Sequence, residues 1–145
     1  MSTFRRESPA PKRSLLVRVV ESLIVLRENS ATPTDRDWDE FLEILAANRS
    51  NFQHIKILVA TDGGGPSSDQ RTRLSVALGG RRVRVAVVTD SIKVRFIVSS
   101  IALLNSEIAT FSKSELSEAY KHLSLTPHEV KLVELAIREM TPLVG

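Results

Sequence analysis

At the centre of the chain, residues Ile55–Arg71 read IKILVATDGGGPSSDQR. A short apolar run that breaks into glycine, proline and serine is typical of a buried β-strand that ends at a surface loop. We therefore expect a strand over residues 55–61 and a helix over residues 69–78, which Ser67 or Ser68 would cap. Because binding residues concentrate on loops that a rigid scaffold holds, this loop is the first candidate for a functional site.

The segment that precedes this stretch predicts two strands and a helix. Residues 15–28, LLVRVVESLIVLRE, are rich in β-branched side chains and are interrupted by Glu21 and Ser22, which indicates two short strands joined there. One long strand or a helix stays open, because the apolar residues also fall at helical spacing. Thr34 would cap the next helix, whose apolar face consists of Trp38, Phe41, Leu42 and Leu45.

The segment that follows continues the alternation of strands and helices. Alternating valines predict a strand in residues 81–89, and residues 107–111 predict another. Residues 92–104 fit both periods, and we expect a helix there because the segment is long and Asp90 or Ser91 can cap it.

Two capping boxes predict the starts of the last two helices. Residues 112–115 read SKSE and residues 126–129 read TPHE, so a hydroxyl residue is followed three positions later by glutamate in both. Pro127 suits the first helical position, and we expect the last helix to end near Met140.

This order of elements predicts an α/β fold in one domain. Two opening strands are followed by strands that alternate with helices, which implies parallel pairs with right-handed crossovers. We expect a mixed β-sheet of about five strands packed with four to five helices, formed by residues 15–145. A chain of 145 residues can build one core of ordinary size.

The net charge of +3 comes from the N-terminal tail. Residues 1–14 hold four basic side chains against one acidic one, namely Arg5, Arg6, Lys12 and Arg13 against Glu7. We predict a disordered basic tail, because this segment has two prolines and no apolar period. The remaining residues hold 16 basic and 16 acidic side chains, so the domain offers no basic face for nucleic acid.

The composition also excludes several classes of protein. The sequence has no cysteine, which excludes a disulfide framework, thiol catalysis and thiolate metal sites. We expect a reducing, cytoplasmic setting. No apolar run approaches the ~20 residues that a membrane span needs.

In this order of elements the chain resembles the STAS superfamily, which includes anti-anti-sigma factors, stressosome proteins and the cytoplasmic ends of sulfate transporters. The resemblance covers about Leu15–Leu125. In the signalling members, the loop after the third strand carries a phosphorylatable serine or threonine at the start of the next helix. The resemblance therefore implies a STAS-like, non-catalytic regulatory module, with Ser67 and Ser68 as phosphorylation candidates. An aspartate typically precedes that serine, whereas Pro66 precedes it here, and both serines can also serve only as helix caps.

The candidate binding surface joins this loop to the start of the helix over residues 92–104. Its residues are Asp62, Gly63, Gly64, Gly65, Ser67, Ser68, Arg71, Asp90, Ser91 and Arg95. The glycines would let the backbone turn, and the two arginines would meet an acidic or phosphorylated protein partner. That partner would be a kinase, an anti-sigma-like protein or a second copy of the chain. The apolar residues 92–104 either extend the surface into a homodimer interface or form a fully buried central helix.

A receiver-like phosphoacceptor domain is the alternative function. Response-regulator receivers place an aspartate, a hydroxyl residue and a lysine after the third, fourth and fifth strands, and Asp62, Thr89 or Ser91, and Lys113 occupy comparable places. Receivers also bind Mg²⁺ through an acidic pair after the first strand, which Glu21 and Glu28 do not form. A small-ligand or lipid-binding α/β protein is a further alternative.

The sequence carries no enzymatic signature. The three consecutive glycines lack the lysine and hydroxyl of a P-loop and the spacing of a dinucleotide fingerprint. His54, His122 and His128 are scattered along the chain. We therefore predict no catalytic residues, no metal site and no cofactor.

Overall fold

The computed structural model describes residues 12–103 and 107–145. The strands are β1 (Leu15–Val20), β2 (Leu23–Glu28), β3 (Lys56–Thr61), β4 (Arg84–Val88) and β5 (Ile108–Phe111). The helices are α1 (Asp35–Ala47), α2 (Ser68–Leu78), α3 (Ile92–Ala102), α4 (Leu116–His122) and α5 (Pro127–Met140). Short 3₁₀ turns cover Arg49–Asn51, Lys113–Glu115 and Thr141–Leu143. Every strand and helix expected from the sequence is present.

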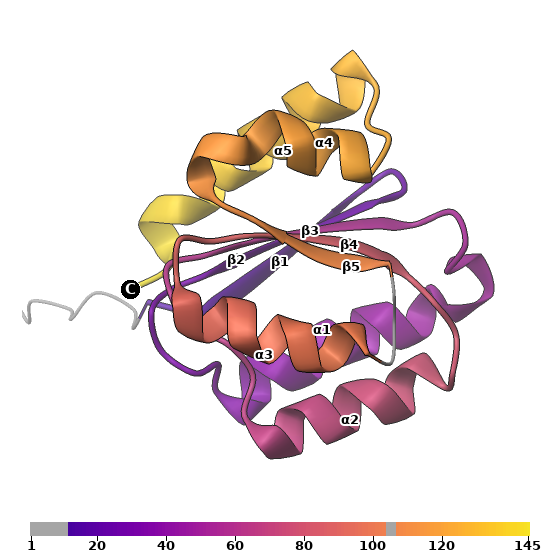
Figure 1. Ribbon diagram of the computed structural model, residues 1–145, viewed down its shortest axis with the longest axis vertical. Coiled ribbons are helices and arrows are strands. Elements are labelled where there is room, and N and C mark those ends of the chain that lie inside the picture. The colour runs from indigo at the N-terminus through magenta and orange to yellow at the C-terminus, as the bar shows by residue number, and fades with distance from the viewer. Residues whose placement is uncertain (1–11, 104–106) are drawn as a thin grey trace, which may run out of the picture.

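The five strands form one mixed sheet in the order β1-β2-β3-β4-β5. The first two strands are antiparallel, and every later neighbour is parallel. Because each parallel strand is added on the same side of the one before it, right-handed crossovers put α1, α2 and α3 on one face of the sheet. Helices α4 and α5 cover the other face (Figure 1). The predicted α/β class, strand number and helix number are confirmed.

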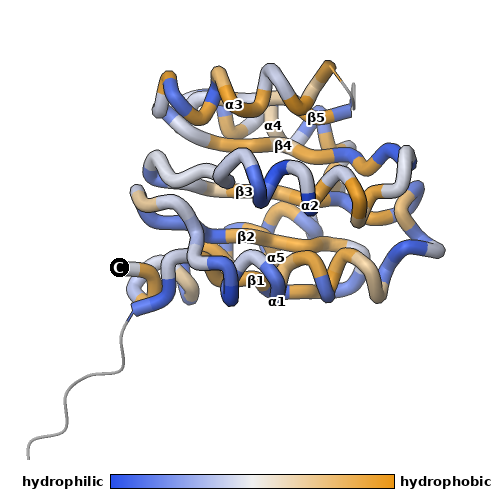
Figure 2. Tube along the Cα trace, turned by 90° about the horizontal axis from the view of Figure 1, so that it is seen from below, coloured by the Kyte–Doolittle hydropathy of each residue, from blue (hydrophilic) through white to orange (hydrophobic). Residues whose placement is uncertain are grey.

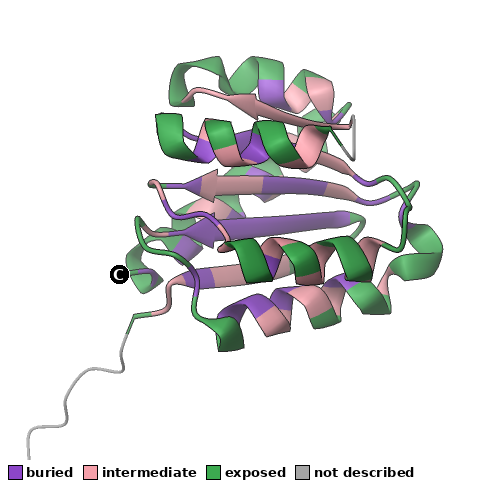
Figure 3. Ribbon diagram, turned by 60° about the horizontal axis from the view of Figure 1, so that its bottom comes forward, coloured by how far each residue is buried: buried purple, intermediate pink, exposed green. Residues whose placement is uncertain are grey.

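Strand β2 is buried on both faces and separates the two halves of the core. All six of its residues are buried. Ile24 and Leu26 pack toward α1, whereas Leu23 and Val25 pack toward α4 and α5. Figure 2 shows that most of this strand is hydrophobic, and Figure 3 shows buried strands behind helices with exposed outer faces. The period of two in β2 therefore decides which side chains face each layer.

Hydroxyl side chains start the helices where the sequence placed them. Thr34, Ser67, Ser91 and Thr126 cap α1, α2, α3 and α5, and each accepts a hydrogen bond from the backbone amide three residues on. The capping box that starts at Ser112 opens a 3₁₀ turn that leads into α4. Where two caps were possible, the structure selects Ser67 and Ser91.

The start of the domain lies before the predicted boundary at residue 15. Arg13 donates hydrogen bonds to Asp37 and to Glu40, at 2.7 and 2.6 Å. Its backbone N–H donates to Leu143, and Gly145 donates to its carbonyl. Arg13 therefore belongs to the domain, and the tail prediction for residues 1–11 lies outside the described residues.

Of the two alternatives for residues 92–104, the structure excludes the fully buried central helix. Helix α3 lies beside β5, the last strand of the sheet, and of its residues only Val94 and Val98 are buried. A helix that covers the border of a sheet meets protein on one side alone, so its outer face stays in water. Residue 104, the predicted end of this helix, lies outside the described residues.

Candidate functional site

The loops that follow β3 and β4 lie side by side, as the candidate surface requires. A Cβ atom on Gly63 would lie 3.9 Å from Cβ of Ser91. Gly63 has a φ of 135°, which L side chains rarely adopt, and its N–H donates to the Thr61 hydroxyl at 3.2 Å. The structure therefore brings the two predicted loops together at the carboxyl edge of the parallel strands.

Gly64 is required by a close approach of the loop between β2 and α1. A Cβ atom there would lie 2.1 Å from the carbonyl oxygen of Ala31 and 2.7 Å from that of Asn29. The Gly64 N–H donates to Asn29, and the Thr61 hydroxyl donates to the Gly64 carbonyl at 2.7 Å. The glycines thus allow the two loops to pack, which is a structural role.

Ser67 and Ser68 differ in accessibility. Ser67 is half-buried in a reciprocal capping box, in which it accepts from Gln70 N–H at 3.1 Å and donates its own N–H to Gln70 Oε1 at 3.0 Å. Ser68 is the first residue of α2 and is exposed. Arg71 donates to the Pro66 carbonyl at 3.0 Å and so stabilises the loop itself.

Asp62 and Asp90 are joined by Lys113. The Lys113 ammonium lies 3.6 Å from Asp62 Oδ1, and the Lys113 backbone N–H donates to Asp90 Oδ1 at 3.0 Å. The second oxygen of Asp62 accepts from Arg27 Nη2 at 2.9 Å. Arg95 instead donates to the Thr89 carbonyl at 3.4 Å. The sequence analysis did not include Arg27 among the candidate residues, because a basic residue within an apolar strand does not show which acidic group it meets across the sheet.

The receiver-like arrangement is present only in part. Asp62 and Lys113 do meet, but Thr89 is fully buried and accepts from the Ser91 N–H at 3.0 Å. The strand order also differs from the order 2-1-3-4-5 of doubly wound receivers. Within residues 12–103 and 107–145, no group of three or more His, Cys, Asp or Glu side chains could hold a metal ion.

A polar hollow lies between this edge and the α4–α5 layer. Its volume is about 530 Å³, and its lining includes Arg27, Asp62, Lys113, Tyr120 and Arg138. Burial and the neighbouring Glu134 carboxylate raise the pKa of Tyr120 to about 12. Charged groups in this hollow are mainly paired with each other, which is what a surface ion network needs for stability.

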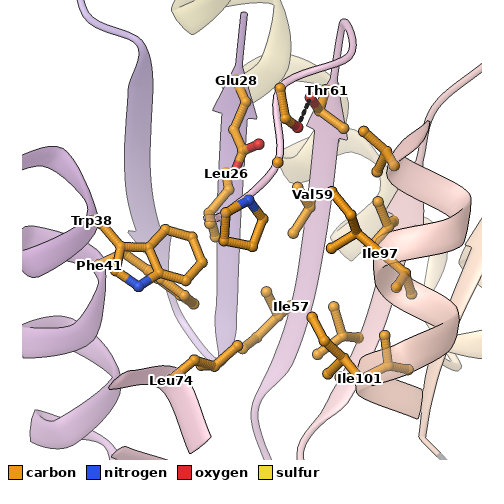
Figure 4. Close-up of a pocket in the computed structure, with 18 of the residues that line it drawn as sticks. Leu26, Glu28, Trp38, Phe41, Ile57, Val59, Thr61, Leu74, Ile97 and Ile101 are labelled. Atoms are coloured by element: carbon orange, nitrogen blue, oxygen red, sulfur yellow. Dashed lines mark hydrogen bonds between the residues drawn. The ribbon is translucent and has the colours of Figure 1, made fainter. Parts of the chain in front are cut away.

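A second cavity lies beneath α2, on the opposite face of the sheet. Its volume is about 90 Å³, and its wall is formed by apolar side chains of all three helices of this layer and of β2–β4. Figure 4 shows Leu74 of α2, Ile97 and Ile101 of α3, and Ile57 and Val59 of β3 converging on it. Gly64, Gly65 and Pro66 of the candidate loop form part of the same wall. The sequence analysis did not predict this cavity.

Glu28 stands at the end of this cavity. It continues the alternation of Ile24 and Leu26, so it faces the α1–α3 layer, and it is 3% exposed. Burial raises the pKa of Glu28 to about 8, against smaller lowering effects of the Thr61 hydroxyl and the Arg27 charge. The signal was available in the sequence, because a strand that is apolar on both faces ends with a glutamate in an inward position.

An apolar stripe is exposed on α3 beside the candidate loops. Ile92 is 83% exposed and Phe96 is 79% exposed, and the two lie one helical turn apart. Leu103, just beyond the helix, is 88% exposed. In the sequence, Lys93 and Arg95 lie between Ile92 and Phe96. Large exposed apolar side chains next to charged ones are typical of a protein-binding surface.

The chain has no match among protein-family models, curated proteins or solved structures. The resemblance to STAS domains therefore stays a prediction. The part of the chain that the structure describes contains no helix both long and apolar enough to cross a membrane.

Proposed function

We propose that this chain is a non-catalytic regulatory module that binds an acidic partner protein on the outer face of α3 and the adjoining loops. The exposure of Ile92 and Phe96 carries the proposal. Two large apolar side chains on one helix turn are unfavourable in water, and a partner that covered them would gain binding free energy. The STAS resemblance supports the same kind of function, since its signalling members act by binding other proteins.

Charge favours a different protein over a second copy of the chain. Lys93 and Arg95 are the charged residues of α3, and the helix carries no acidic side chain. A two-fold interface through this face would set these positive charges against themselves, which disfavours association. An acidic partner would complement them while covering Phe96.

A phosphate on Ser68 would act on this interaction. Ser68 is exposed at the first position of α2, where unpaired backbone amides and the helix dipole favour negative charge. A phosphate there would bring negative charge to the loop beside Arg71 and repel an acidic partner. The module would then be released by phosphorylation, in the cytoplasm that the absence of cysteine favours.

Site-specific photo-cross-linking tests the docking surface. A photoreactive amino acid replaces Phe96 in one variant and Leu135 in the control, since Leu135 is 47% exposed on α5, on the other face of the sheet. We expect position 96 to cross-link to an acidic protein and position 135 to give no such product. The purified partner should then bind the Leu135→Asp variant and not the Phe96→Asp variant.

Two results would contradict this function. Equal cross-linking from positions 96 and 135 would mean that the α3 stripe has no special role. A product that contains only a second copy of the chain would replace the acidic partner by self-association, and sedimentation of the Phe96→Asp variant as a monomer would establish that.

A further inference from the structure

Helix α2 is held at its two ends and is poorly packed in its middle. Of its 11 residues, Gln70 is the one that is buried. At the start, the Gln70 side-chain amide donates to the Pro33 carbonyl at 2.8 Å. The Gln70 backbone carbonyl accepts from Trp38 Nε1 at 3.0 Å. At the end, Arg49 donates to the Ala77 carbonyl at 3.3 Å. These polar contacts fix the helix over the sheet without filling the space beneath it.

The strands under α2 show the consequence. Val59 and Val85 belong to the inner strands β3 and β4, yet both are only half-buried. Leu74 and Leu78, on the inner side of α2, are also only half-buried. Close-packed interiors rarely leave such positions uncovered, and the space that these side chains line is the cavity of about 90 Å³.

The wall of the cavity selects an apolar occupant. Apart from Glu28 and Thr61 at one end, its side chains are aliphatic, together with Trp38 and Phe41, as Figure 4 shows. An enclosed apolar cavity of ~150 Å³ binds benzene, so apolar walls of this kind suit a small apolar molecule. A cavity of about 90 Å³ would therefore take a smaller molecule, of roughly four or five non-hydrogen atoms.

Two polar side chains, Glu28 and Thr61, stand at the end of the cavity, and the Thr61 hydroxyl already donates to the Gly64 carbonyl. Among the described residues of the wall, Glu28 is the only ionisable side chain. The guanidinium of Arg27 is bonded to Asp62, to Thr141 and to the Glu28 carbonyl, and the effect of its charge on Glu28 is smaller than that of burial. A neutral carboxyl group can both donate to and accept from a hydroxyl group, whereas an anion would enter without a cation to pair with.

We propose that the cavity beneath α2 binds a small, uncharged, aliphatic molecule whose single hydroxyl group lies against Glu28. This site is separate from the outer face of α3, since Ile97 and Ile101 of the cavity wall lie on the inner side of the helix that exposes Ile92 and Phe96. The proposal therefore does not rest on the proposed docking function.

Methyl-detected NMR titration of the purified chain with 1-butanol tests the site. Butylamine and butyrate serve as probes with the same chain and a charged head. We expect saturable shifts of the methyl signals of Val59, Val85, Ile97 and Ile101 with 1-butanol, and at least tenfold weaker effects with butyrate. Binding to the native state should also raise the melting temperature in a concentration-dependent way.

Filling the cavity should abolish the effect. Leu74→Phe places an aromatic ring in the cavity from α2, and its matched control Val76→Phe adds the same ring on the outer side, where Val76 is 74% exposed. We expect the 1-butanol shifts to vanish in the first variant and to persist in the second. Val59→Phe fills the cavity from the sheet and provides a second variant if Leu74→Phe does not fold by circular dichroism.

The head-group assignment has its own test. Glu28→Met keeps the bulk and removes the hydrogen bond, so it should weaken 1-butanol binding roughly three- to tenfold, while Glu28→Gln should retain it. The site is refuted if wild-type protein shows no saturable shift, or if Leu74→Phe and Val59→Phe bind as well as the wild type. Binding of butyrate as tight as that of 1-butanol would contradict the proposal that the ligand is uncharged. Phe96→Asp separates the cavity from the docking surface, because Phe96 does not line the cavity. We expect the 1-butanol shifts to be unchanged in this variant, whether or not it loses a protein partner.

Discussion

Glu28 and Thr61 are register partners at the ends of the parallel strands β2 and β3, and both side chains face the cavity beneath α2. A polar pair therefore closes an apolar space at the same edge where the candidate loops begin. The Thr61 hydroxyl donates to the Gly64 carbonyl, which ties this end of the cavity to the loop. Four measurements on stability follow from these contacts and from those at the start of the chain.

Replacing Glu28 should change how stability depends on pH. Burial raises the pKa of Glu28 to about 8 from an ordinary 4.5, so the folded protein keeps a proton that the unfolded chain releases. Between those values the free energy of unfolding falls with rising pH, by up to about 1.4 kcal/mol per unit. Glu28→Gln stays neutral, so its stability relative to wild type should rise from pH 5 to pH 8 in urea denaturation. The exposed Glu43→Gln controls for a lost surface carboxylate, and a Glu28→Gln difference that is constant with pH would contradict the raised pKa.

Gly64→Ala should be severely destabilising. The new methyl group would lie 2.1 Å from the Ala31 carbonyl oxygen, and a backbone atom cannot move aside as a flexible side chain can. We expect a loss of roughly 3 kcal/mol or more in the free energy of unfolding. Gly80→Asn is the control, because no atom lies within 4 Å and asparagine tolerates a φ of 77°. Equal stability of the two variants would mean that the loops do not approach as described.

Ser67→Ala and Ser68→Ala should separate the two serines. Ser67 makes both bonds of the α2 capping box, so its replacement should cost about 1 kcal/mol. Ser68 is exposed, and its replacement should change stability by less than about 0.5 kcal/mol. Chemical denaturation measures both values. If Ser68→Ala cost more stability than Ser67→Ala, Ser68 and not Ser67 would be the cap of α2.

Asp37→Asn should destabilise the protein at neutral pH and less so in acid. Burial acts to raise the pKa of Asp37, but hydrogen bonds from Ser14 and Arg13 outweigh it and lower the pKa below its ordinary value. A depressed folded pKa contributes stability above the unfolded value, and that stability is lost as the pH falls through the folded one. We expect a cost of about 2 kcal/mol at pH 7. A cost that does not shrink below pH 4 would argue against the ionised contact.

Local chemistry explains why so much of the fold could be predicted. A cap such as Thr34 or Thr126 acts on amides three residues away, and a glycine such as Gly79 ends a helix by its own backbone angles, with a φ of 57°. Such signals lie within one short window of sequence. The class of fold follows from their order, because parallel strands need helical crossovers of one hand.

The candidate site could be predicted only as a neighbourhood. The sequence placed Asp62 and Asp90 at the ends of adjacent strands, and the structure joins them through Lys113. It did not indicate that Arg27 would take the other Asp62 oxygen, because the partner of a side chain depends on how two elements turn toward each other. Arg71 and Arg95 likewise reach carbonyl groups near them in the chain.

By itself, the sequence determined the elements, their order and the caps that start them, since those depend on residues a few positions apart. Only the tertiary structure decided that Gly64 would meet Ala31, that α2 would stand over a cavity closed by Glu28, and that Phe96 would face water. Each of these depends on the distance between elements far apart in the chain. That distance is set by how all the side chains between them pack, and no single window of the sequence contains it.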